Sequence, residues 1–414
     1  MLPDQPTLPP SMDPVAEGYV KLVLAVGRHD PRYVDAYYGP GLLKEAVDAE
    51  KPSLAVIRER AVELQEALPV PSALGPDKLL QLRRDYLRTQ LDSLIAYVDI
   101  LGGKKMTFDE ESKALYDAVA PHFPDEHFEA IAGELDTLLP GKGSVADRYH
   151  AFRDRFVIPK DKLDTVFRAA IEECRDRTSR HIELPPGESF DIEYVTGKPW
   201  SAYNWYKGRF HSVIQVNTDL PIYIDRAIDL ACHEGYPGHH VYNTLLESHL
   251  TSGLGWVEFS VYPLFSPQSL IAEGAANYGI EMAFPGAERL TFEAEKLFPL
   301  AGLDPETAPL YDEVQKKVEQ LAYAGNEAAR LYIHGSIDAG EAAARLMKYS
   351  LMEKDRAEQR VRFIDTYRSY VINYNLGKDL VRKYVEAKGG ESMDRRWEVF
   401  GRLLSSPRLP SNLK

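Results

Sequence analysis

Residues 233–240 read HEGYPGHH and bring three of the chain's 11 histidines together within eight positions. A histidine followed at once by a glutamate, with further histidines close behind, is typical of hydrolytic zinc sites in which the glutamate acts as general base. In the common arrangement a second histidine stands four residues after the first, on the same face of one helix. Pro237 occupies that position here, so the next candidates are His239 and His240.

The spacing of these histidines predicts a break in the helix. A regular helix rises about 1.5 Å per residue, so residues six or seven apart lie roughly 9 to 10 Å from each other along its axis. Two such histidines cannot both reach one zinc ion at about 2.0 to 2.1 Å unless the helix is interrupted between them. Gly235, Pro237 and Gly238 favour such an interruption. Spacing alone does not choose between His239 and His240, although His239 needs the smaller insertion.

A third metal ligand is expected in the segment AEGAANYGIE at residues 272–281, which lies on a predicted helix. Small residues follow Glu273 and allow close packing against the motif, and Asn277 lies one turn later, where its amide can orient a ligand. Glu281 shares that face two turns along. The sequence therefore predicts a site of two histidines and Glu273, with Glu234 as the base. A plain glycine-proline turn with surface histidines is the weaker interpretation.

Aromatic and β-branched residues crowd the segment before the motif and predict one small antiparallel sheet beside the site. Elsewhere, apolar residues recur at three- and four-residue spacings, which is typical of amphipathic helices. Thr107 with Glu110 and Ser144 with Asp147 are capping-box signatures of helix starts. We therefore expect a mainly α fold. The expected strands are 190–195, 202–206 and 211–217, and the expected helices include 15–29, 54–68, 79–101, 160–181, 266–284, 306–333, 338–352 and 356–370.

The chain divides into three expected parts. Residues 1–14 hold five prolines and predict an extended arm. Residues 15–182 form an N-terminal helical region without obvious chemistry. Residues 183–405 hold the sheet, the motif and the later helices, and we expect them to form one continuous domain with the preceding region. Residues 35–41, rich in aromatic side chains and glycine, are expected to form a loop.

The charge, the apolar runs and the cysteine count of the chain indicate which kinds of partner and which cellular compartment to expect. The net charge of the chain is −14. Proteins that bind nucleic acids need a clustered basic surface to neutralise phosphates, so no nucleic-acid partner is expected. No apolar run approaches the roughly 18 residues of a membrane span, and the first residues show no leader pattern, so we expect no membrane partner and a cytoplasmic protein. Two cysteines are too few for a disulfide framework. The sequence does not predict the oligomeric state.

Three sequence features together resemble a known family: the motif HEGYPGHH, the downstream Glu273-Gly274, and the C-terminal Tyr374-x-x-Gly377-Lys378. This is the "domain of unknown function 885" family, bacterial proteins regarded as zinc-dependent metallopeptidases. The resemblance covers roughly the second half of the chain, from the predicted sheet to Lys378. It implies a large, mostly helical fold akin to gluzincin peptidases such as the carboxypeptidase Taq and the angiotensin-converting enzymes.

The resemblance also implies roles for single residues. His233 and His239 would hold one Zn²⁺ ion together with Glu273, and Glu234 would be the general base. Members of the family commonly read EGWALYAE where this chain reads EGAANYGIE, so an extra residue precedes Glu281. The role of the second glutamate therefore does not carry over to Glu281.

The end of the chain resembles the family's closing motif. Arg368 could hold a substrate carboxylate through two hydrogen bonds, and the hydroxyl of Tyr374 could donate to the oxyanion of a tetrahedral intermediate. An ordinary amphipathic helix is the competing interpretation of this segment. His334 stands where relatives often carry a histidine, which implies a further oxyanion role.

These features predict a zinc-dependent hydrolase that cleaves a peptide or amide bond. Zinc lowers the pKa of a bound water toward ~7, Glu234 takes its proton, and the same carboxyl later protonates the leaving amine. Two alternatives remain. An iron-dependent oxygenase can also use two histidines and a carboxylate, but such sites generally sit in β-barrels. A non-enzymatic helical binding protein with a structural or vestigial metal site would have no use for Glu234.

Overall fold

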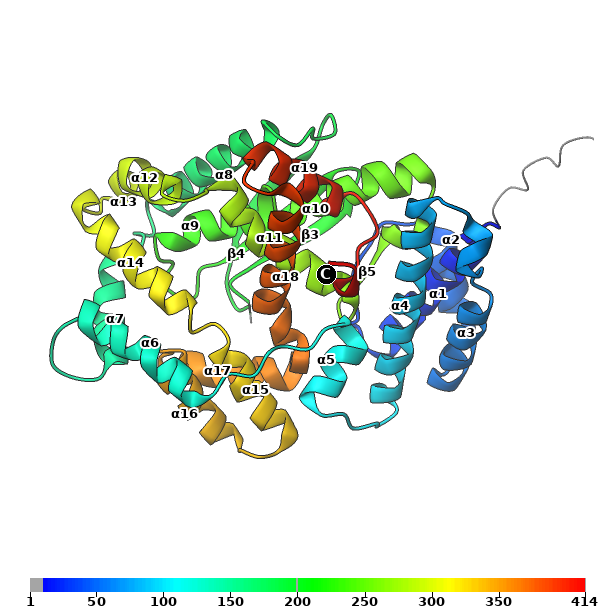
Figure 1. Ribbon diagram of the computed structural model, residues 1–414, viewed down its shortest axis with the longest axis horizontal. Coiled ribbons are helices and arrows are strands. Elements are labelled where there is room, and N and C mark those ends of the chain that lie inside the picture. Colours follow the sequence, from blue (N-terminus) through cyan, green and yellow to red (C-terminus); the bar gives the residue numbers. More distant parts are fainter. Residues whose placement is uncertain (1–9, 199, 414) are drawn as a thin grey trace, which may run out of the picture.

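The computed structural model describes residues 10–198 and 200–413. Helices dominate these residues, and the strands form only two small sheets, so the predicted mainly α fold is confirmed. In Figure 1 the earliest helices gather at one end of an elongated molecule, and α6, α7 and α12 to α14 lie at the other end. No helix among the described residues has the length and apolar character needed to cross a membrane.

The N-terminal helices follow their sequence signals closely. Helix α1 (Asp13–His29) begins two residues before the predicted start, with a proline in its first turn. Residues 13 and 14 of the predicted arm therefore belong to a helix, and residues 1–9 lie outside the described residues. Both capping boxes are present: Thr107 caps α5 (Phe108–Tyr116) and Ser144 caps α7 (Val145–Arg153).

The remaining helices cover the rest of the chain in order. The predicted helix 306–333 is divided in two, because the chain leaves the helix between Glu319 and Ala324. The helices are α2 (Gly41–Glu50), α3 (Leu54–Glu66), α4 (Lys78–Leu101), α6 (Asp125–Leu138), α8 (Leu163–Ser179), α9 (Asp225–Leu230), α10 (His239–Leu246), α11 (Pro267–Ala283), α12 (Glu288–Phe292), α13 (Phe298–Ala301), α14 (Ala308–Glu319), α15 (Ala324–His334), α16 (Ala339–Tyr349), α17 (Lys354–Tyr367), α18 (Ile372–Gly389) and α19 (Met393–Leu404).

The sheet beside the motif is mixed, so the prediction of an antiparallel sheet was wrong in part. Strands β3 (Ala202–Gly208) and β4 (His211–Asn217) form the expected antiparallel hairpin, but β2 (Ser189–Val195) pairs with β4 in parallel. The order is β2-β4-β3. The three strands do alternate in direction along the chain, but β4 lies between the other two. The alternation of apolar and polar residues predicts which face of a strand each side chain lies on, but it does not predict which strands pair with each other.

A second, two-stranded sheet was not predicted. Strand β1 (Val34–Tyr37) pairs antiparallel with β5 (Val261–Pro263), so part of the expected loop 35–41 is a strand. The pairing joins residues more than 200 positions apart, and each strand is very short. Strand β5 ends shortly before α11, so this pairing joins the N-terminal part of the chain to the segment that leads into the helix with Glu273.

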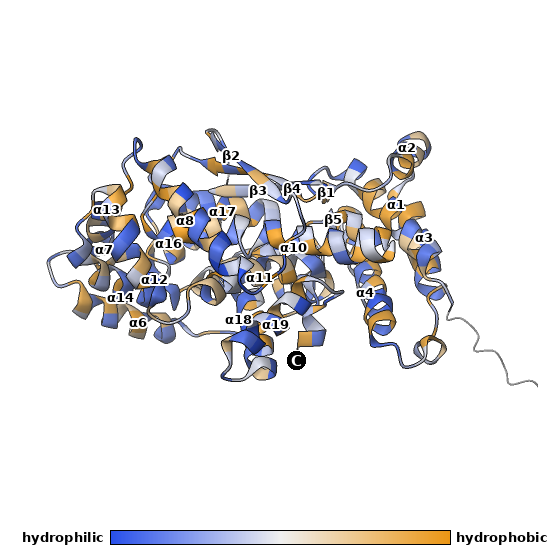
Figure 2. Ribbon diagram, turned by 90° about the horizontal axis from the view of Figure 1, so that it is seen from above, coloured by the Kyte–Doolittle hydropathy of each residue, from blue (hydrophilic) through white to orange (hydrophobic). Residues whose placement is uncertain are grey.

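Two large clusters of buried apolar side chains fill the interior. One is built on the sheet, the motif helices and the C-terminal helices, and the other on α1, α4 and α5 together with residues of the second half of the chain. Helix α11 belongs to both, because Leu270 lies in one cluster and Ile271 in the other. Figure 2 shows that many outer helices carry both hydrophilic and hydrophobic residues. The division of the chain at residue 182 stays a prediction.

Candidate metal centre

The HEGYPGHH stretch breaks the helix where its glycines and proline predict. Helix α9 runs into a wide π-helical turn, Ala231–Gly235, which carries His233 and Glu234. The amide of Tyr236 donates to the carbonyl of Ala231, five residues earlier, at 3.1 Å. A new helix, α10, then begins at His239. The break replaces a long axial separation with a tight reversal of the chain.

Gly238 makes this reversal possible. Its amide donates to the carbonyl of Cys232 at 2.9 Å. A Cβ atom at this position would lie 1.9 Å from the carbonyl oxygen of His233 and 2.4 Å from that of Cys232. Because backbone atoms cannot yield as a flexible side chain can, only glycine fits. Helix α10 therefore starts directly against the turn that carries the first histidine.

Three side-chain atoms converge at this place, from the π-helical turn, from α10 and from α11. The Nε2 atoms of His233 and His239 are 3.1 Å apart. Oε2 of Glu273 lies 3.3 Å from the first nitrogen and 3.7 Å from the second. A tetrahedral zinc ion with bonds of about 2.0 to 2.1 Å separates its ligand atoms by about 3.3 Å. The three atoms thus have the spacing of ligands around one zinc ion.

The carboxylate of Glu273 is only half satisfied by the protein. Its Oε1 accepts a hydrogen bond from the hydroxyl of Tyr370 at 2.8 Å. Its Oε2 is buried and lacks a hydrogen bond of normal geometry. Burial by itself raises the pKa of Glu273, but contacts with His233 and His239 outweigh this and hold the pKa well below its usual value. A buried carboxylate oxygen that accepts no hydrogen bond is costly unless a positive charge lies beside it, so the residues fit a metal ion.

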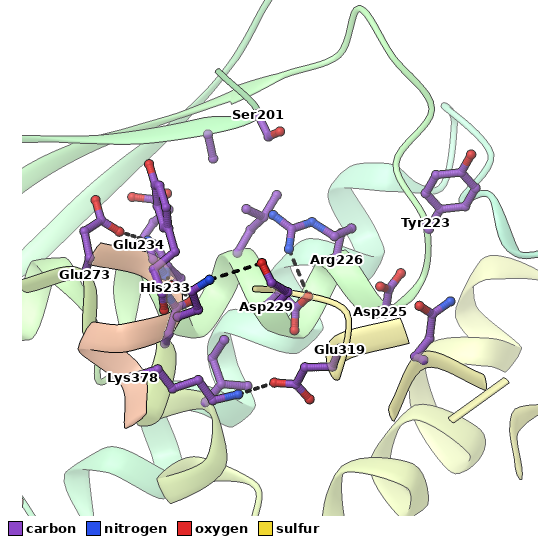
Figure 3. A pocket seen from close by; sticks show the side chains of 18 of the residues that line it. Ser201, Tyr223, Asp225, Arg226, Asp229, His233, Glu234, Glu273, Glu319 and Lys378 are labelled. Atoms are coloured by element: carbon purple, nitrogen blue, oxygen red, sulfur yellow. Dashed lines mark hydrogen bonds and ion pairs between the residues drawn. The ribbon is translucent and has the colours of Figure 1, made fainter. Parts of the chain in front are cut away.

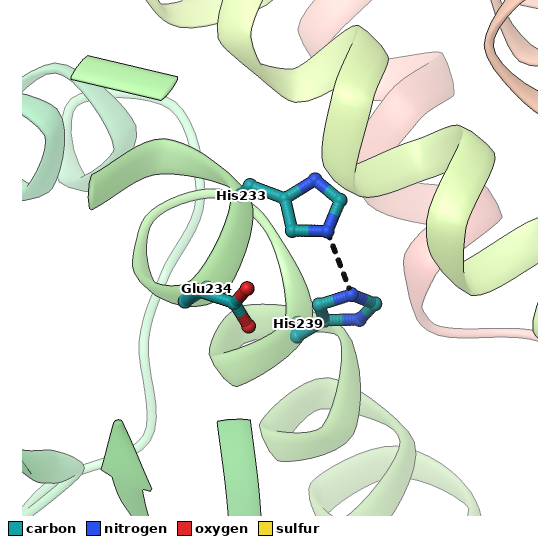
Figure 4. Close-up of side chains that lie close together, drawn as sticks. All are labelled: His233, Glu234 and His239. Atoms are coloured by element: carbon teal, nitrogen blue, oxygen red, sulfur yellow. Dashed lines mark hydrogen bonds between the residues drawn. The ribbon is translucent and has the colours of Figure 1, made fainter. Parts of the chain in front are cut away.

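Glu234 faces the same space. His233, Glu234 and His239 each offer a ligand atom, and these atoms lie within 4.8 Å of one another, so the cluster could hold a metal (Figure 4). Asn204 on β3 donates to the backbone carbonyl of Glu234 at 2.7 Å, which ties the turn to the sheet. Two carboxylates therefore flank the histidines, one from the motif itself and one from α11.

The second candidate histidine, His240, points away from this cluster. Its ring is buried, with Nδ1 2.8 Å from Oγ of Ser212 and Nε2 2.9 Å from Oε2 of Glu188. Consecutive residues of a helix project about 100° apart, so only one of His239 and His240 can face His233. The structure brings His239 to the site and uses His240 to hold α10 against β4.

Asn277 orients the first histidine, as its position one turn after Glu273 suggested. Its Oδ1 lies 3.1 Å from Nδ1 of His233, and its amide nitrogen donates to the backbone carbonyl of Tyr374 at 3.1 Å. The second bond fixes which end of the amide faces the imidazole. Nδ1 of His233 must then carry the proton, which leaves the lone pair of Nε2 free for a metal.

The cluster opens into a large cavity of about 1190 Å³. Figure 3 shows His233, Glu234 and Glu273 on one side of it, with charged residues such as Arg226, Asp229 and Lys378 further along. Glu281 also lines the cavity, where it pairs with Lys378 at 2.7 Å and with Arg382. Its carboxylate is thus occupied by two cations, and it does not join the three converging atoms.

Of the three further residues predicted to act in catalysis, only Tyr374 lines the cavity. Burial, with Glu273 next, raises the pKa of its hydroxyl well above the usual value. His334 is exposed at the end of α15, and its Nδ1 lies 2.8 Å from Oγ of Ser336. Arg368 donates to the buried carboxylate of Glu111 at 2.5 Å. Neither His334 nor Arg368 is among the residues that line the cavity, so the structure does not bring them to the converging atoms.

Sequence reasoning missed residues that reach the cavity from distant parts of the chain. Asp35 on β1 accepts a hydrogen bond from the hydroxyl of Tyr203 on β3. Burial raises the pKa of Asp35 to about 7; nearby His239 opposes this shift, and Glu273 adds to it. Tyr370 and Arg360 also line the cavity. The position of Asp35 in the cavity could not be predicted, because nothing in the sequence links residue 35 to the motif.

No family model matches the chain. Among curated proteins, large ribosomal subunit protein bL9 of Mycoplasmopsis synoviae is 28% identical over 123 residues, which are 27% of this chain and 80% of that protein. So short a match at this identity does not show a family.

Solved structures share the fold. A protein of Colwellia psychrerythraea, provisionally described as a lipoprotein, has a TM-score of 0.55 at 14% identity, over 99% of this chain and 76% of that chain. A similarly described protein of unknown function from Shewanella oneidensis has a TM-score of 0.50 at 13% identity, over 90% and 74%. A carboxypeptidase from Deinococcus radiodurans covers 95% and 87% at 13% identity, but its TM-score of 0.42 is too low to carry a conclusion.

Proposed function

We propose that the protein is a zinc-dependent hydrolase that cleaves a peptide or amide bond. The observation that carries the proposal is the convergence of Nε2 of His233, Nε2 of His239 and Oε2 of Glu273 at separations of 3.1 to 3.7 Å. Two imidazoles and one carboxylate are the protein ligands of many catalytic zinc sites. The resemblance of the motif to the family of domain 885 points the same way, and membership of that family is part of the proposal.

Glu234 is proposed as the general base. It is the carboxylate that stays beside the two histidines once Glu273 is assigned to the metal, and it lies within 4.8 Å of both ring nitrogens. A zinc ion at this place would supply a water of lowered pKa. Glu234 would accept the proton of that water and return it to the leaving nitrogen, which requires a single carboxylate close to both.

Tyr374 is proposed to stabilise charge on the substrate carbonyl. Its ring lies 5.8 Å from that of Tyr370, whose own hydroxyl is already bonded to Glu273. Because burial keeps the pKa of Tyr374 high, its hydroxyl stays protonated and can donate a hydrogen bond to a developing oxyanion. Tyr370 instead holds the metal-binding carboxylate in place.

A hydrolysis assay with a metal measurement on the same samples tests the proposal. The substrate is a peptide library, and the proteins are the wild type and Glu234→Gln, both loaded with zinc. We expect equal zinc content and a loss of about 1,000-fold in the hydrolysis rate of the variant, since a general base contributes roughly 10² to 10⁴. Glu319→Gln is the matched control, because Glu319 lines the same cavity but lies away from the histidines.

The outcomes separate the alternatives. A zinc-loaded wild type that cleaves no peptide, or a Glu234→Gln variant as active as the wild type, would overturn the proposed function. A protein that binds zinc without hydrolysis would instead fit a structural metal site, and one that selects iron would fit the oxygenase alternative.

A further inference from the structure

One face of α17 forms a wall of the cavity. Arg356, Arg360, Phe363 and Tyr367 line the cavity, and they follow one another at spacings of four, three and four residues. This is the repeat of a single helical face. Helix α17 therefore presents two arginines and two aromatic rings to the same space as the metal site.

Most basic residues around the cavity are neutralised by neighbouring carboxylates. Arg356 and Arg360 differ, because neither forms an ion pair or a hydrogen bond with any residue that the structure describes. Of the two, Arg360 is the one whose guanidinium carbon lies 5.9 Å from the ring centre of Tyr374. In a chain with 63 acidic and 49 basic residues, a partly buried arginine without a carboxylate is unexpected. The paired cations are Arg153 with Asp225, Arg226 with Asp229, Arg289 with Asp229 and Glu293, Lys316 with Asp312, Lys378 with Glu281 and Glu319, and Arg396 with Glu386.

The recorded contacts of Arg360 are with aromatic rings. Its guanidinium carbon lies 4.7 Å from the ring centre of Phe363 and 5.9 Å from that of Tyr374. Burial lowers the pKa of Arg360 from its usual value, which is the effect of a positive charge removed from water without a compensating anion. The face of an aromatic ring attracts a cation. The five N–H groups of a guanidinium point outward in its own plane, and a stacked ring accepts no hydrogen bond from them. Those donors are left for a ligand.

Arg360 lies close to the metal-binding side chains. Its neighbour Tyr374 packs against Tyr370 at 5.8 Å between ring centres, and the hydroxyl of Tyr370 bonds to Glu273 at 2.8 Å. One residue of an extended peptide spans at most about 3.3 to 3.6 Å. A negative charge held by Arg360 would therefore lie only a few residues from a carbonyl held at the metal site.

We propose that Arg360 binds the C-terminal carboxylate of a peptide substrate, so that the cavity selects peptides with a free C-terminus and releases a short C-terminal fragment. This inference rests on the proposed peptide hydrolysis. A planar guanidinium matches a carboxylate through two parallel hydrogen bonds. We assign the role to Arg360 rather than to Arg356, which lies one turn earlier on α17 and also lacks a carboxylate, because Arg360 contacts Tyr374, the residue proposed to face the substrate carbonyl.

A matched pair of peptides tests the inference. Both peptides have a blocked N-terminus, and the C-terminus is a free carboxylate in one and a carboxamide in the other. The value of kcat/KM is measured with zinc-loaded wild type, Arg360→Gln and Arg356→Gln. The wild type should prefer the free acid by about 100-fold, because the amide leaves a buried charge unpaired. Arg360→Gln should cleave both peptides with nearly equal efficiency. Arg356→Gln removes the other unpaired arginine of the same helix face and should keep the preference. A preference that is lost in Arg356→Gln and kept in Arg360→Gln overturns the assignment to Arg360.

A binding measurement separates this inference from the proposed function. Calorimetric titration of zinc-loaded Glu234→Gln with the same two peptides needs no hydrolysis, and Arg360→Gln is added to that background as the comparison. Tighter binding of the acid that disappears with Arg360→Gln supports the inference even if no peptide is cleaved. Equal binding of acid and amide, or a preference that survives Arg360→Gln, overturns it and leaves the hydrolase proposal standing. A preference that follows an acidic side chain in amidated peptides also overturns it.

Discussion

Among single residues, Asn277 shows how the chemistry of one histidine is set by an atom that is not near the metal position. The backbone carbonyl of Tyr374 accepts a hydrogen bond from the amide nitrogen of Asn277, so the amide oxygen must face His233. That choice places the proton on Nδ1 and leaves Nε2 as the donor atom. We therefore expect Asn277 to be a positioning residue, which would act on a metal ion only through His233.

Replacing Asn277 tests this role. Asn277→Ala should weaken zinc affinity about 10- to 100-fold, the usual effect of losing a partner that orients a ligand, with little change in helix content. Competitive titration with a zinc chelator measures the affinity. Asn375→Ala is a suitable control, because its amide contacts Asn326 on a neighbouring helix rather than a histidine. An unchanged zinc affinity in Asn277→Ala would show that the hydrogen bond does not orient the ring.

The residues of the metal centre differ in how well the sequence revealed them. His233 and Glu234 are adjacent and form a recognisable pair, and Glu273 was identified because small residues surround it. Arg368 and Arg360 show the limit of such reasoning. Both lie in the segment predicted to be helical, but which face of that helix meets the cavity depends on packing against helices far away in the sequence.

At the scale of elements, the close crossing of α11 and α18 places Glu273 beside the motif. Gly274 and Gly377 meet at this crossing. A Cβ atom on Gly377 would lie 2.6 Å from the carbonyl oxygen of Leu270, and one on Gly274 would lie 2.3 Å from the backbone of Gly377. The two helices thus touch backbone to backbone, directly next to Glu273, the proposed metal ligand.

A methyl group at this crossing should push the helices apart. Gly377→Ala is expected to lower the free energy of unfolding by about 2 to 3 kcal/mol, as overpacking does, and to weaken zinc binding because Glu273 moves away from the histidines. Urea unfolding of the metal-free protein and a zinc titration measure the two effects. Gly133→Ala in α6 is the control, since no atom lies within 4 Å of its added Cβ and alanine favours a helix. Equal stability of both variants would contradict the backbone contact.

Long helices and their caps were predictable because periodicity and capping are local in the sequence. Elements defined by distant partners were not. Strand β1 has four residues and pairs with β5 across more than 200 positions, so nothing local marks it. The parallel pairing of β2 with β4 depends on the same kind of long-range choice. Even the correctly placed break at Gly235 to Gly238 left His239 and His240 undecided until the turn itself was visible.

At the scale of the whole molecule, the candidate ligands come from elements that belong to different parts of the interior. His233 and His239 flank the reversal between α9 and α10, whereas Glu273 lies on α11, which is buried between both apolar clusters. The mainly α class followed from periodicity and from the resemblance of the motif. The arrangement that brings Glu273 to the two histidines of the motif required the complete fold.

The measurement that tests the central claim most directly is an equilibrium titration of the metal-free protein with zinc. We predict one zinc ion per chain for the wild type and for Glu234→Gln, since Glu234 is not a ligand, and a loss of tight binding for Glu273→Ala. A wild type that binds no zinc, or a Glu273→Ala variant that binds it as tightly as the wild type, would contradict the ligand set of His233, His239 and Glu273.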